Sequence, residues 1–329
     1  MSKFDKDYIE LCKKILREGY RRHNRTGVDT YMIPSAHFEF DLQKEFPILT
    51  TKQVFIRQAI LEMMWIWQVQ SNDVRWLQER GVNIWNEWEV DEDGIYRIYD
   101  NKSTISTENK AVPVMDLDGK PMMGPDGKPM MATGRVPGKT IKAAKFYGKE
   151  FAHTIGTAYG YIVKKYGLMD SLLDTIKKNP DDRRMVKSLW QDCELRTAVL
   201  PSCVWSTEWD VTDKKLNLMV HQRSCDVPLG LPFNVTQYAT LLRLVAQATG
   251  LEPGVIDYSI KNAHIYENQV DGIVTQIERF DKKGSLPAPE LWVNPDVTDF
   301  YKFDNSRDCK DVQLVRYKHM GKIHFPIAQ

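Results

Sequence analysis

A strand-like run, a polar loop and a helical run follow one another between residues 215 and 250. Residues 215–222 are rich in Leu and Val and predict a strand, while residues 235–249 predict a helix that ends at Gly250. The loop between them, Gln222–Asn234, holds one Arg, one Ser, one Asp, one Asn, one Gly and two Pro. A loop that only connects two elements needs no such mixture, so the segment predicts a binding loop.

The side chains of this loop suit a nucleotide. Arg223 and Ser224 offer a planar fork of N–H donors and a hydroxyl to a phosphate group. Asp226 and Asn234 can each make two hydrogen bonds to a planar heterocycle. Upstream lies Cys203. A thiol, a phosphate clamp and an amide together indicate covalent chemistry on a nucleotide.

The chain resembles the thymidylate synthases, and the resemblance follows the chain in order. The matching segments are Arg25–Gly27, Phe46–Lys52, Glu62–Trp65, Ile84–Trp88, Ala158–Gly160, Arg183–Arg184, Gln222–Asn234 and His264–Tyr266. The resemblance that they mark covers roughly four-fifths of the chain and leaves out residues near 91–155. The resemblance implies an α/β fold of the α+β type, in which helices cover a large twisted mixed β-sheet. It also implies a homodimer whose two sheets pack back to back.

The hydrophobic pattern predicts further elements. We expect helices over residues 4–20, 53–70 and 170–178, the second of them buried because it is apolar on nearly every side. Strands are expected over residues 35–42, 184–191 and 204–211, with two more in the tail over 312–317 and 322–326.

We expect residues 1–329 to form a single catalytic domain with a surface insertion at about 91–155. This stretch holds a tandem repeat, Asp118–Met123 and Asp126–Met131. Two copies are too few for a solenoid, and their Asp-Gly and Lys-Pro pairs are typical of turns. A surface for a partner or for RNA is the alternative, but the insertion is favoured.

Charge and cysteine content argue against a nucleic-acid-binding, membrane-bound, secreted or zinc-binding protein. With a net charge of +1 the 329-residue chain has no global field to attract nucleic acid or membranes, so a local Arg cluster must hold any anionic ligand. The N-terminus lacks an apolar signal region. Five cysteines without paired zinc spacing indicate a reducing cytoplasm and no metal site.

Cys203 is the predicted nucleophile. A thiolate that adds to C6 of a uracil ring turns C5 into a carbon that attacks a one-carbon unit. Taken alone, a free cysteine is more often a packed structural residue, and the match to the family decides for catalysis. Arg223 would hold phosphate and also favour the thiolate. The family often has His after this Cys, whereas one branch has Val, as Val204 does here.

Two further residues are predicted to handle protons. Glu62 stands among apolar residues, which should raise its pKa toward neutrality; a buried ion pair with Arg57 or Lys52 is the alternative. The resemblance places Tyr159 near C5, where a proton must leave. A packed aromatic without a role in catalysis is the alternative for Tyr159.

The resemblance implies how the substrate dUMP is bound. The phosphate clamp would consist of Arg25, Arg183, Arg184, Arg223 and Ser224, with Arg183 and Arg184 supplied by the second subunit, so that active sites are shared. An ion pair with the preceding Asp181–Asp182 is the alternative for that Arg pair. Asn234 would read uracil, because its amide matches N3–H and O4, and His264 and Tyr266 would hold the 3′-hydroxyl. Asn262 stands where the family has Asp and is not assigned to the site.

The one-carbon donor implied is 5,10-methylenetetrahydrofolate. Asp226 would pair with its pterin, and the apolar wall would consist of Trp85, Trp88, Leu229, Gly230 and Phe233. The tail Pro326–Gln329, with Ala328, resembles the segment that closes over the folate, although Asn86 and Gln329 depart from the family pattern. A dUMP hydroxymethylase of the same family is the nearest alternative. A non-catalytic binding protein for RNA is a more distant one.

Overall fold

The computed structural model describes residues 2–24, 26–99, 111–136 and 139–327. Within this part of the chain, seven strands form one mixed sheet. Its main path runs β1 (Tyr20–Arg22), β2 (Thr30–Asp41), β11 (Glu252–Tyr266), β9 (Lys215–Gln222), β8 (Val204–Thr212) and β7 (Val186–Ser188), and β10 (Cys225–Asp226) pairs with β11. The long strand β11 lies antiparallel to β2 and parallel to β9, so the sheet is mixed, as predicted.

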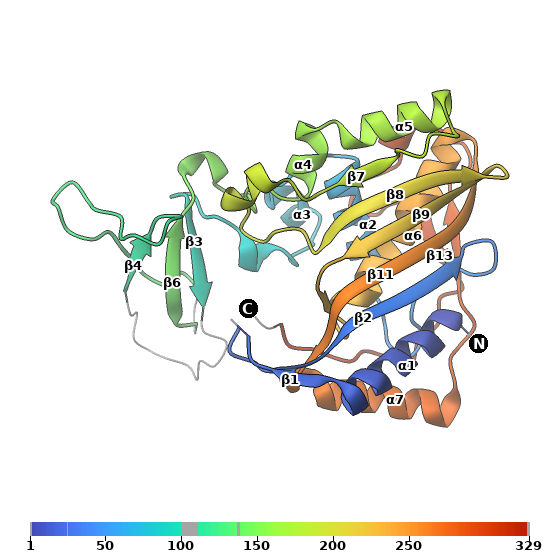
Figure 1. The fold of residues 1–329 in the computed structure, drawn as a ribbon, viewed down its shortest axis with the longest axis horizontal. Helices are drawn as coiled ribbons and strands as arrows, with labels where there is room; N and C mark the ends of the chain where they lie inside the picture. The colour runs from blue at the N-terminus through green and yellow to red at the C-terminus, as the bar shows by residue number, and fades with distance from the viewer. Residues whose placement is uncertain (1, 25, 100–110, 137–138, 328–329) are drawn as a thin grey trace.

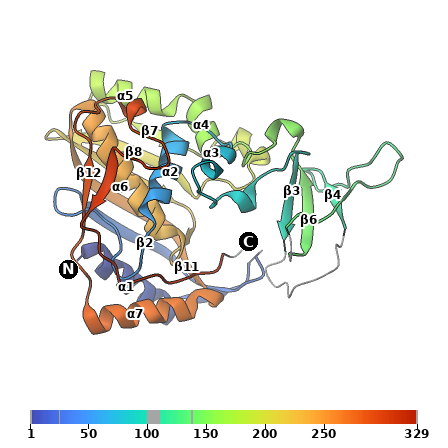
Figure 2. The same ribbon diagram turned by 180° about the vertical axis from the view of Figure 1, so that it is seen from behind.

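Helices cover one face of this sheet. The ribbon shows α2 (Ile56–Trp67) and α6 (Gly230–Thr249) on the far side of β8, β9 and β11, while the near side of these strands carries no described helix (Figure 1). Seen from behind, α2 and α6 lie in front of the strands, and α1 (Lys3–Glu18) and α7 (Val270–Lys283) lie along the β1–β2 edge (Figure 2). The predicted helix-covered sheet is therefore confirmed.

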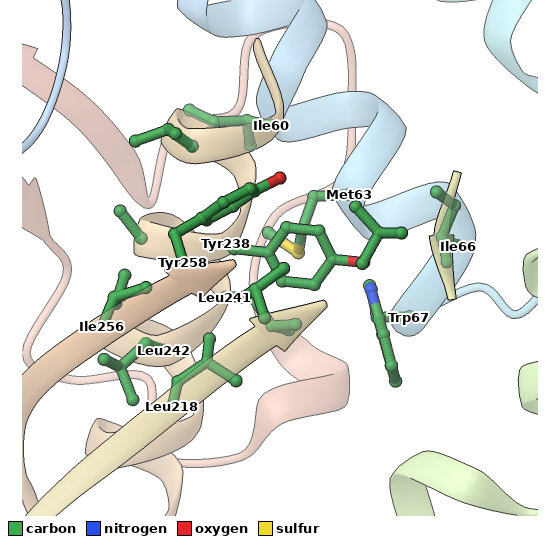
Figure 3. Close-up of a cluster of buried hydrophobic side chains, with 14 of the residues drawn as sticks. Ile60, Met63, Ile66, Trp67, Leu218, Tyr238, Leu241, Leu242, Ile256 and Tyr258 are labelled. Atoms are coloured by element: carbon green, nitrogen blue, oxygen red, sulfur yellow. The ribbon is translucent and has the colours of Figure 1, made fainter. Parts of the chain in front are cut away.

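The core lies between α6, α2 and the sheet. Tyr238 and Leu241 of α6 lie among strand residues such as Tyr258 and α2 residues such as Met63 (Figure 3). Tyr238 also meets Trp67 of α2 edge to face, with ring centroids 6.5 Å apart. Because α6 is enclosed by the sheet on one side and by α2 on the other, it carries apolar residues around most of its circumference.

We expect Leu241→Ala to lower the free energy of unfolding by about 3 kcal/mol, because Leu241 is fully buried and its truncation leaves a cavity. Val274→Ala is the matched control: this residue of α7 is 42% exposed, so its truncation should change stability by less than about 0.5 kcal/mol. Urea unfolding of both variants at one protein concentration measures the difference. Equal losses would contradict this placement of the core.

Most predicted elements are present, with two differences. The helix predicted from Val235 begins at Gly230, because Pro232 falls in the first turn, where the missing N–H has no helical partner to lose. Of the two predicted tail strands, the first is present as β13 (Val312–Val315), which pairs with β12 (Glu290–Val293), and the second is wrong, because residues 322–326 form no strand. The other helices are α3 (Arg75–Gln78), α4 (Gly160–Lys165), α5 (Leu168–Lys178) and the 3₁₀ turns η1 (Asn86–Trp88), η2 (Lys149–Phe151), η3 (Asp192–Thr197), η4 (Glu267–Gln269) and η5 (Phe300–Lys302).

Residues 95–146 contain a second sheet that projects to one side of the molecule (Figure 1). Its order is β3 (Ile95–Tyr99), β6 (Ile141–Phe146), β4 (Val112–Met115) and β5 (Met131–Ala132). A small core of its own includes Val114 and Ala144. The tandem repeat forms the turns between β4 and β5, and Asp118 in it pairs with Arg196 of η3 at 2.8 Å. That this stretch is an insertion into a single catalytic domain stays a prediction.

No helix in the part of the chain described here combines the length and the apolar character that crossing a membrane requires.

Candidate active site

A pocket of about 510 Å³ opens where the binding loop, the end of β11 and the chain's tail meet. Nine of the predicted site residues line it: Trp88, Cys203, Arg223, Ser224, Asp226, Leu229, Gly230, His264 and Tyr266. Residues 22–24, Thr26 and Thr30 close one side, and Ile327 lines the pocket from the tail. Segments far apart in the sequence therefore converge on one cavity.

Cys203 stands directly before β8 and is partly exposed to this pocket. The guanidinium of Arg223 is held by the carbonyl oxygens of Ser202 and Pro201 at 3.0 and 2.6 Å, which brings Nη2 to 4.0 Å from the Cys203 Sγ. A fixed positive charge beside a thiol favours the thiolate. By contrast, burial raises the pKa of the Cys12 thiol to about 12, so that residue stays an inert thiol.

Tyr159 contacts the same segment. Its hydroxyl accepts a hydrogen bond from the Cys203 N–H at 2.9 Å, and its ring packs edge to face on Trp85 with centroids 5.4 Å apart. Burial raises the pKa of Tyr159 well above its usual range, so the hydroxyl stays protonated. Its φ of 49° is a strained left-handed conformation for a non-glycine residue, and strain of this kind gathers at functional sites.

Glu62 is a buried carboxyl group behind the aromatic wall. Its Oε1 accepts from the Trp85 indole N–H at 2.7 Å, and its Oε2 accepts from the Gln237 amide. Burial raises the pKa of Glu62 to about 7. The alternative ion pairs are wrong, because Lys52 donates to the Pro228 carbonyl and Arg57 to carbonyls at 80 and 307.

The raised pKa of Glu62 makes stability depend on pH. In the unfolded chain this carboxyl loses its proton near its usual pKa of 4.5, whereas in the folded chain it keeps the proton to about 7. The contribution of the neutral group is therefore present below pH 4.5 and is lost as pH rises to 7, by about 3 kcal/mol.

We expect Glu62→Gln to remove this loss, since an amide cannot ionise. Urea unfolding of both proteins at pH 5, 6, 7 and 8 should show the variant gaining stability relative to the native chain across this range. Parallel pH profiles would contradict a raised pKa. The same change should lower kcat by about 10²-fold if the group moves protons.

Asn234 is the fifth residue of α6, four residues after Gly230, which lines the pocket. Its Oδ1 accepts from Gln222 at 3.2 Å, and its Nδ2 donates to the Gln237 Oε1 at 3.4 Å. Gln222 is fixed in turn, because its Oε1 accepts from the Tyr258 hydroxyl at 2.7 Å. These contacts set which side of the Asn234 amide is the acceptor, as a reader of a base edge requires.

His264 and Asp226 are neighbours across the β10–β11 pair. The Nδ1 of His264 lies 2.9 Å from the Asn262 carbonyl oxygen, which can only accept, so Nδ1 carries the proton. Burial lowers the pKa of His264 and keeps the ring neutral, which leaves Nε2 as an acceptor. Burial raises the pKa of Asp226, whose Oδ1 accepts from the Leu229 N–H at 3.0 Å.

Some predicted residues are placed elsewhere. Trp85 and Phe233 do not line the cavity, although Trp85 packs on Trp88, which does, with ring centroids 5.5 Å apart. Arg183 and Arg184 are exposed away from this chain's own pocket, and Arg184 pairs with Asp182 at 2.9 Å, as the alternative had it. Arg25 and Ala328 lie outside the described residues.

Sequence reasoning missed several contributors. Asn262, set aside because it departs from the family, lines the pocket, and its φ of 50° is one that Asn tolerates well. Gln222, Gln237 and Gln269 are buried and orient site residues. Polar amides at positions where the strand or helix pattern predicts burial were the signal that could have found them.

The comparisons agree with this site. The family model described as "Thymidylate synthase" matches residues 6–329. Over the whole of both chains, the sequence is 41% identical to the thymidylate synthase of Clostridium beijerinckii and 33% identical to that of Bacillus phage phi3T. The solved thermostable thymidylate synthase A from Bacillus subtilis superposes with a TM-score of 0.74 at 33% identity, covering 99% of each chain.

A mixed sheet with helices on one face, and a pocket that brings a thiol close to an Arg–Ser loop, suit a transferase that acts on nucleotides. The chain belongs to the thymidylate synthase family. It is thus an enzyme, a methyltransferase of dTMP biosynthesis, whose family uses a folate co-substrate. This confirms the predicted family and enzyme class, and the hydroxymethylase alternative finds no support among these relatives.

Proposed function

We propose that the chain converts dUMP to dTMP by reductive methylation. In this reaction 5,10-methylenetetrahydrofolate supplies the carbon and a hydride and leaves as dihydrofolate. The observation that carries the proposal is the half-exposed thiol of Cys203 in the main pocket, with the Arg223 guanidinium held 4.0 Å from its sulfur. The pocket also carries the donors and acceptors that a nucleotide needs.

In this proposal dUMP lies along the binding loop. Arg223 and Ser224 hold its phosphate. The Nε2 of the neutral His264 accepts a hydrogen bond from the 3′-hydroxyl, next to Tyr266, whose ring centroid lies 5.1 Å from that of His264. The Asn234 amide pairs with N3–H and O4 of uracil. Cytosine reverses that donor and acceptor pattern, so a fixed amide discriminates against it.

The chemistry begins when the Cys203 thiolate bonds to C6 of dUMP, which makes C5 the nucleophile toward the one-carbon unit. Tyr159 stands beside Cys203 to assist loss of the C5 proton, and Glu62, with its pKa near 7, exchanges protons through ordered water. Loss of the C5 proton breaks the bond between the transferred carbon and the folate nitrogen, which leaves a methylene group on C5. Hydride transfer from tetrahydrofolate to this methylene expels the Cys203 thiolate from C6 and gives dTMP and dihydrofolate. Water must be excluded at this stage, or it would trap the methylene.

The residues present fit a folate. Trp88, Leu229 and Gly230 line the pocket as an apolar wall, and Trp85 packs on Trp88. Asp226 keeps lone pairs for a pterin edge beyond the two hydrogen bonds that it already accepts. Ile327 lines the opposite side, as expected of a closing tail that continues to Ala328.

We also propose a homodimer with shared sites. The uncovered face of β8, β9 and β11 supplies a surface on which a second sheet can pack (Figure 1). Trp205 is 38% exposed there and contacts His221, with ring centroids 5.5 Å apart. Arg183 and Arg184, far from their own pocket, would complete the phosphate site of the partner. A fully active monomer would refute this. A reducing cytoplasm suits the five cysteines, all of them free thiols.

Incubating the protein with dUMP and 5,10-methylenetetrahydrofolate tests the function. Absorbance follows dihydrofolate, and mass spectrometry identifies the nucleotide. Thymidylate formed in step with dihydrofolate is the expected result. Hydroxymethyl-dUMP without dihydrofolate would instead mean that water completes the reaction, and no turnover would refute the proposal.

A further inference from the structure

We propose that Gln269 is a positioning residue that ties the closing tail to Asp226, so that one side chain sets both parts of the folate site. The inference rests on the proposed role of Asp226 in folate binding. Gln269 ends η4, between the last residue of β11 and the first turn of α7. It does not line the main pocket and is only 1% exposed.

All the hydrogen-bonding atoms of the Gln269 amide are engaged by parts of the site. Its Nε2 donates to the Asp226 Oδ2 at 3.0 Å and to the Pro326 carbonyl oxygen at 3.1 Å. Its Oε1 accepts from the Tyr266 N–H at 3.2 Å. One amide therefore joins the binding loop, the end of β11 and the tail, so that a displacement of one of these segments would weaken its hydrogen bond to Gln269 or move the other two.

The tail reaches Gln269 because Phe325 is anchored next to it. Phe325 is 5% exposed and packs on Gly272 of α7 so closely that a Cβ at position 272 would lie 2.6 Å from the ring. The Lys52 ammonium lies over the same ring, 4.6 Å from its centroid. Beyond this anchor, the Gln269–Pro326 hydrogen bond holds the backbone directly before Ile327, which lines the pocket.

The chemistry of the contact explains why an amide stands here. Asp226 and the Pro326 carbonyl can only accept, while the Tyr266 N–H can only donate, so the side chain between them must offer two N–H groups and one acceptor. Among side chains of this size a carboxamide meets that need. A carboxylate would place two acceptors against Asp226 and Pro326, and a thioether would leave all three groups unpaired in a buried place.

The test compares Gln269→Met with Gln276→Met. Gln276 of α7, the helix that follows η4, is a matched control: it is fully buried, and its Nε2 donates to the Thr51 hydroxyl at 2.8 Å, away from the pocket. For Gln269→Met we expect the folate KM to rise by roughly tenfold or more, as loss of a hydrogen bond to a charged group implies. The KM for dUMP should stay within about threefold, and carboxypeptidase should release the C-terminal residues about tenfold faster.

Gln276→Met should change neither quantity, although its thermal unfolding temperature should also fall. Native values of both readouts in Gln269→Met, or equal shifts in the two variants, would overturn the proposal. If Gln269→Met does not fold, Gln269→Glu keeps the acceptor for Tyr266 and is held to the same criteria. The rate at which carboxypeptidase releases the C-terminal residues is measured without substrates. It therefore tests whether Gln269 holds the tail even if the native chain turns over neither dUMP nor folate.

Discussion

Replacing Cys203 with Ser is expected to lower kcat by about 10⁴-fold or more while the Kd for dUMP changes by less than about threefold. A serine hydroxyl is far less acidic than a thiol and is a poor nucleophile unless a base activates it, so the carbon–sulfur bond at C6 has no equivalent. The oxygen would still stand beside the Arg223 guanidinium, which is anchored on two backbone carbonyls rather than on the thiol. The phosphate clamp should therefore persist.

Turnover assays and dUMP titration measure these two quantities. Cys193→Ser is the control, since Cys193 is exposed, contacts Tyr166 at 3.4 Å and does not line the pocket; it should leave kcat unchanged. Turnover by Cys203→Ser above about 1% of the native rate would refute the nucleophile assignment.

Asn234→Asp is expected to shift the preference of the enzyme from dUMP toward dCMP, with the ratio of kcat/KM values changing by about 10²-fold or more. Cytosine presents an acceptor at N3 and a donor at N4, which a protonated carboxyl group matches and an amide does not. Gln222 can still donate to one oxygen at position 234, whereas Gln237 must turn its amide, because it now faces a second acceptor.

Steady-state assays with both nucleotides measure the preference. Asn234→Ala is the control that distinguishes a change of base preference from a general loss of activity. It should lose activity toward dUMP without gaining any toward dCMP. If Asn234→Asp keeps the native selectivity for dUMP, another residue reads the base. Because Gln237 also binds Glu62, a fall in kcat with both nucleotides is expected to accompany the switch.

The sequence was sufficient for the chemistry of the site. Residue type and local order made a thiol, an Arg–Ser pair, an amide and a carboxyl among apolar residues candidates for the site, and the match to the family motifs then favoured a catalytic role for Cys203 over a packed cysteine. The hydrophobic pattern was also sufficient to predict that the segments of α2 and α6 are helical. Both helices are enclosed by other elements, and a helix in such a position is apolar on most sides. The resemblance then gave the order in which these parts belong together.

Other features depend on which segments meet, and no local pattern contains that. Glu62 forms hydrogen bonds with Trp85 and Gln237 from other segments instead of an ion pair, and burial in the folded chain raises its pKa to about 7. Residues 322–326 form no strand. Phe325 instead packs closely on Gly272, and this contact holds the tail where Ile327 lines the pocket. The sequence thus determined which chemical groups are present and which helices and strands carry them. Burial and contacts between distant segments, which exist only in the folded chain, decided the protonation state, the orientation and the partners of each group.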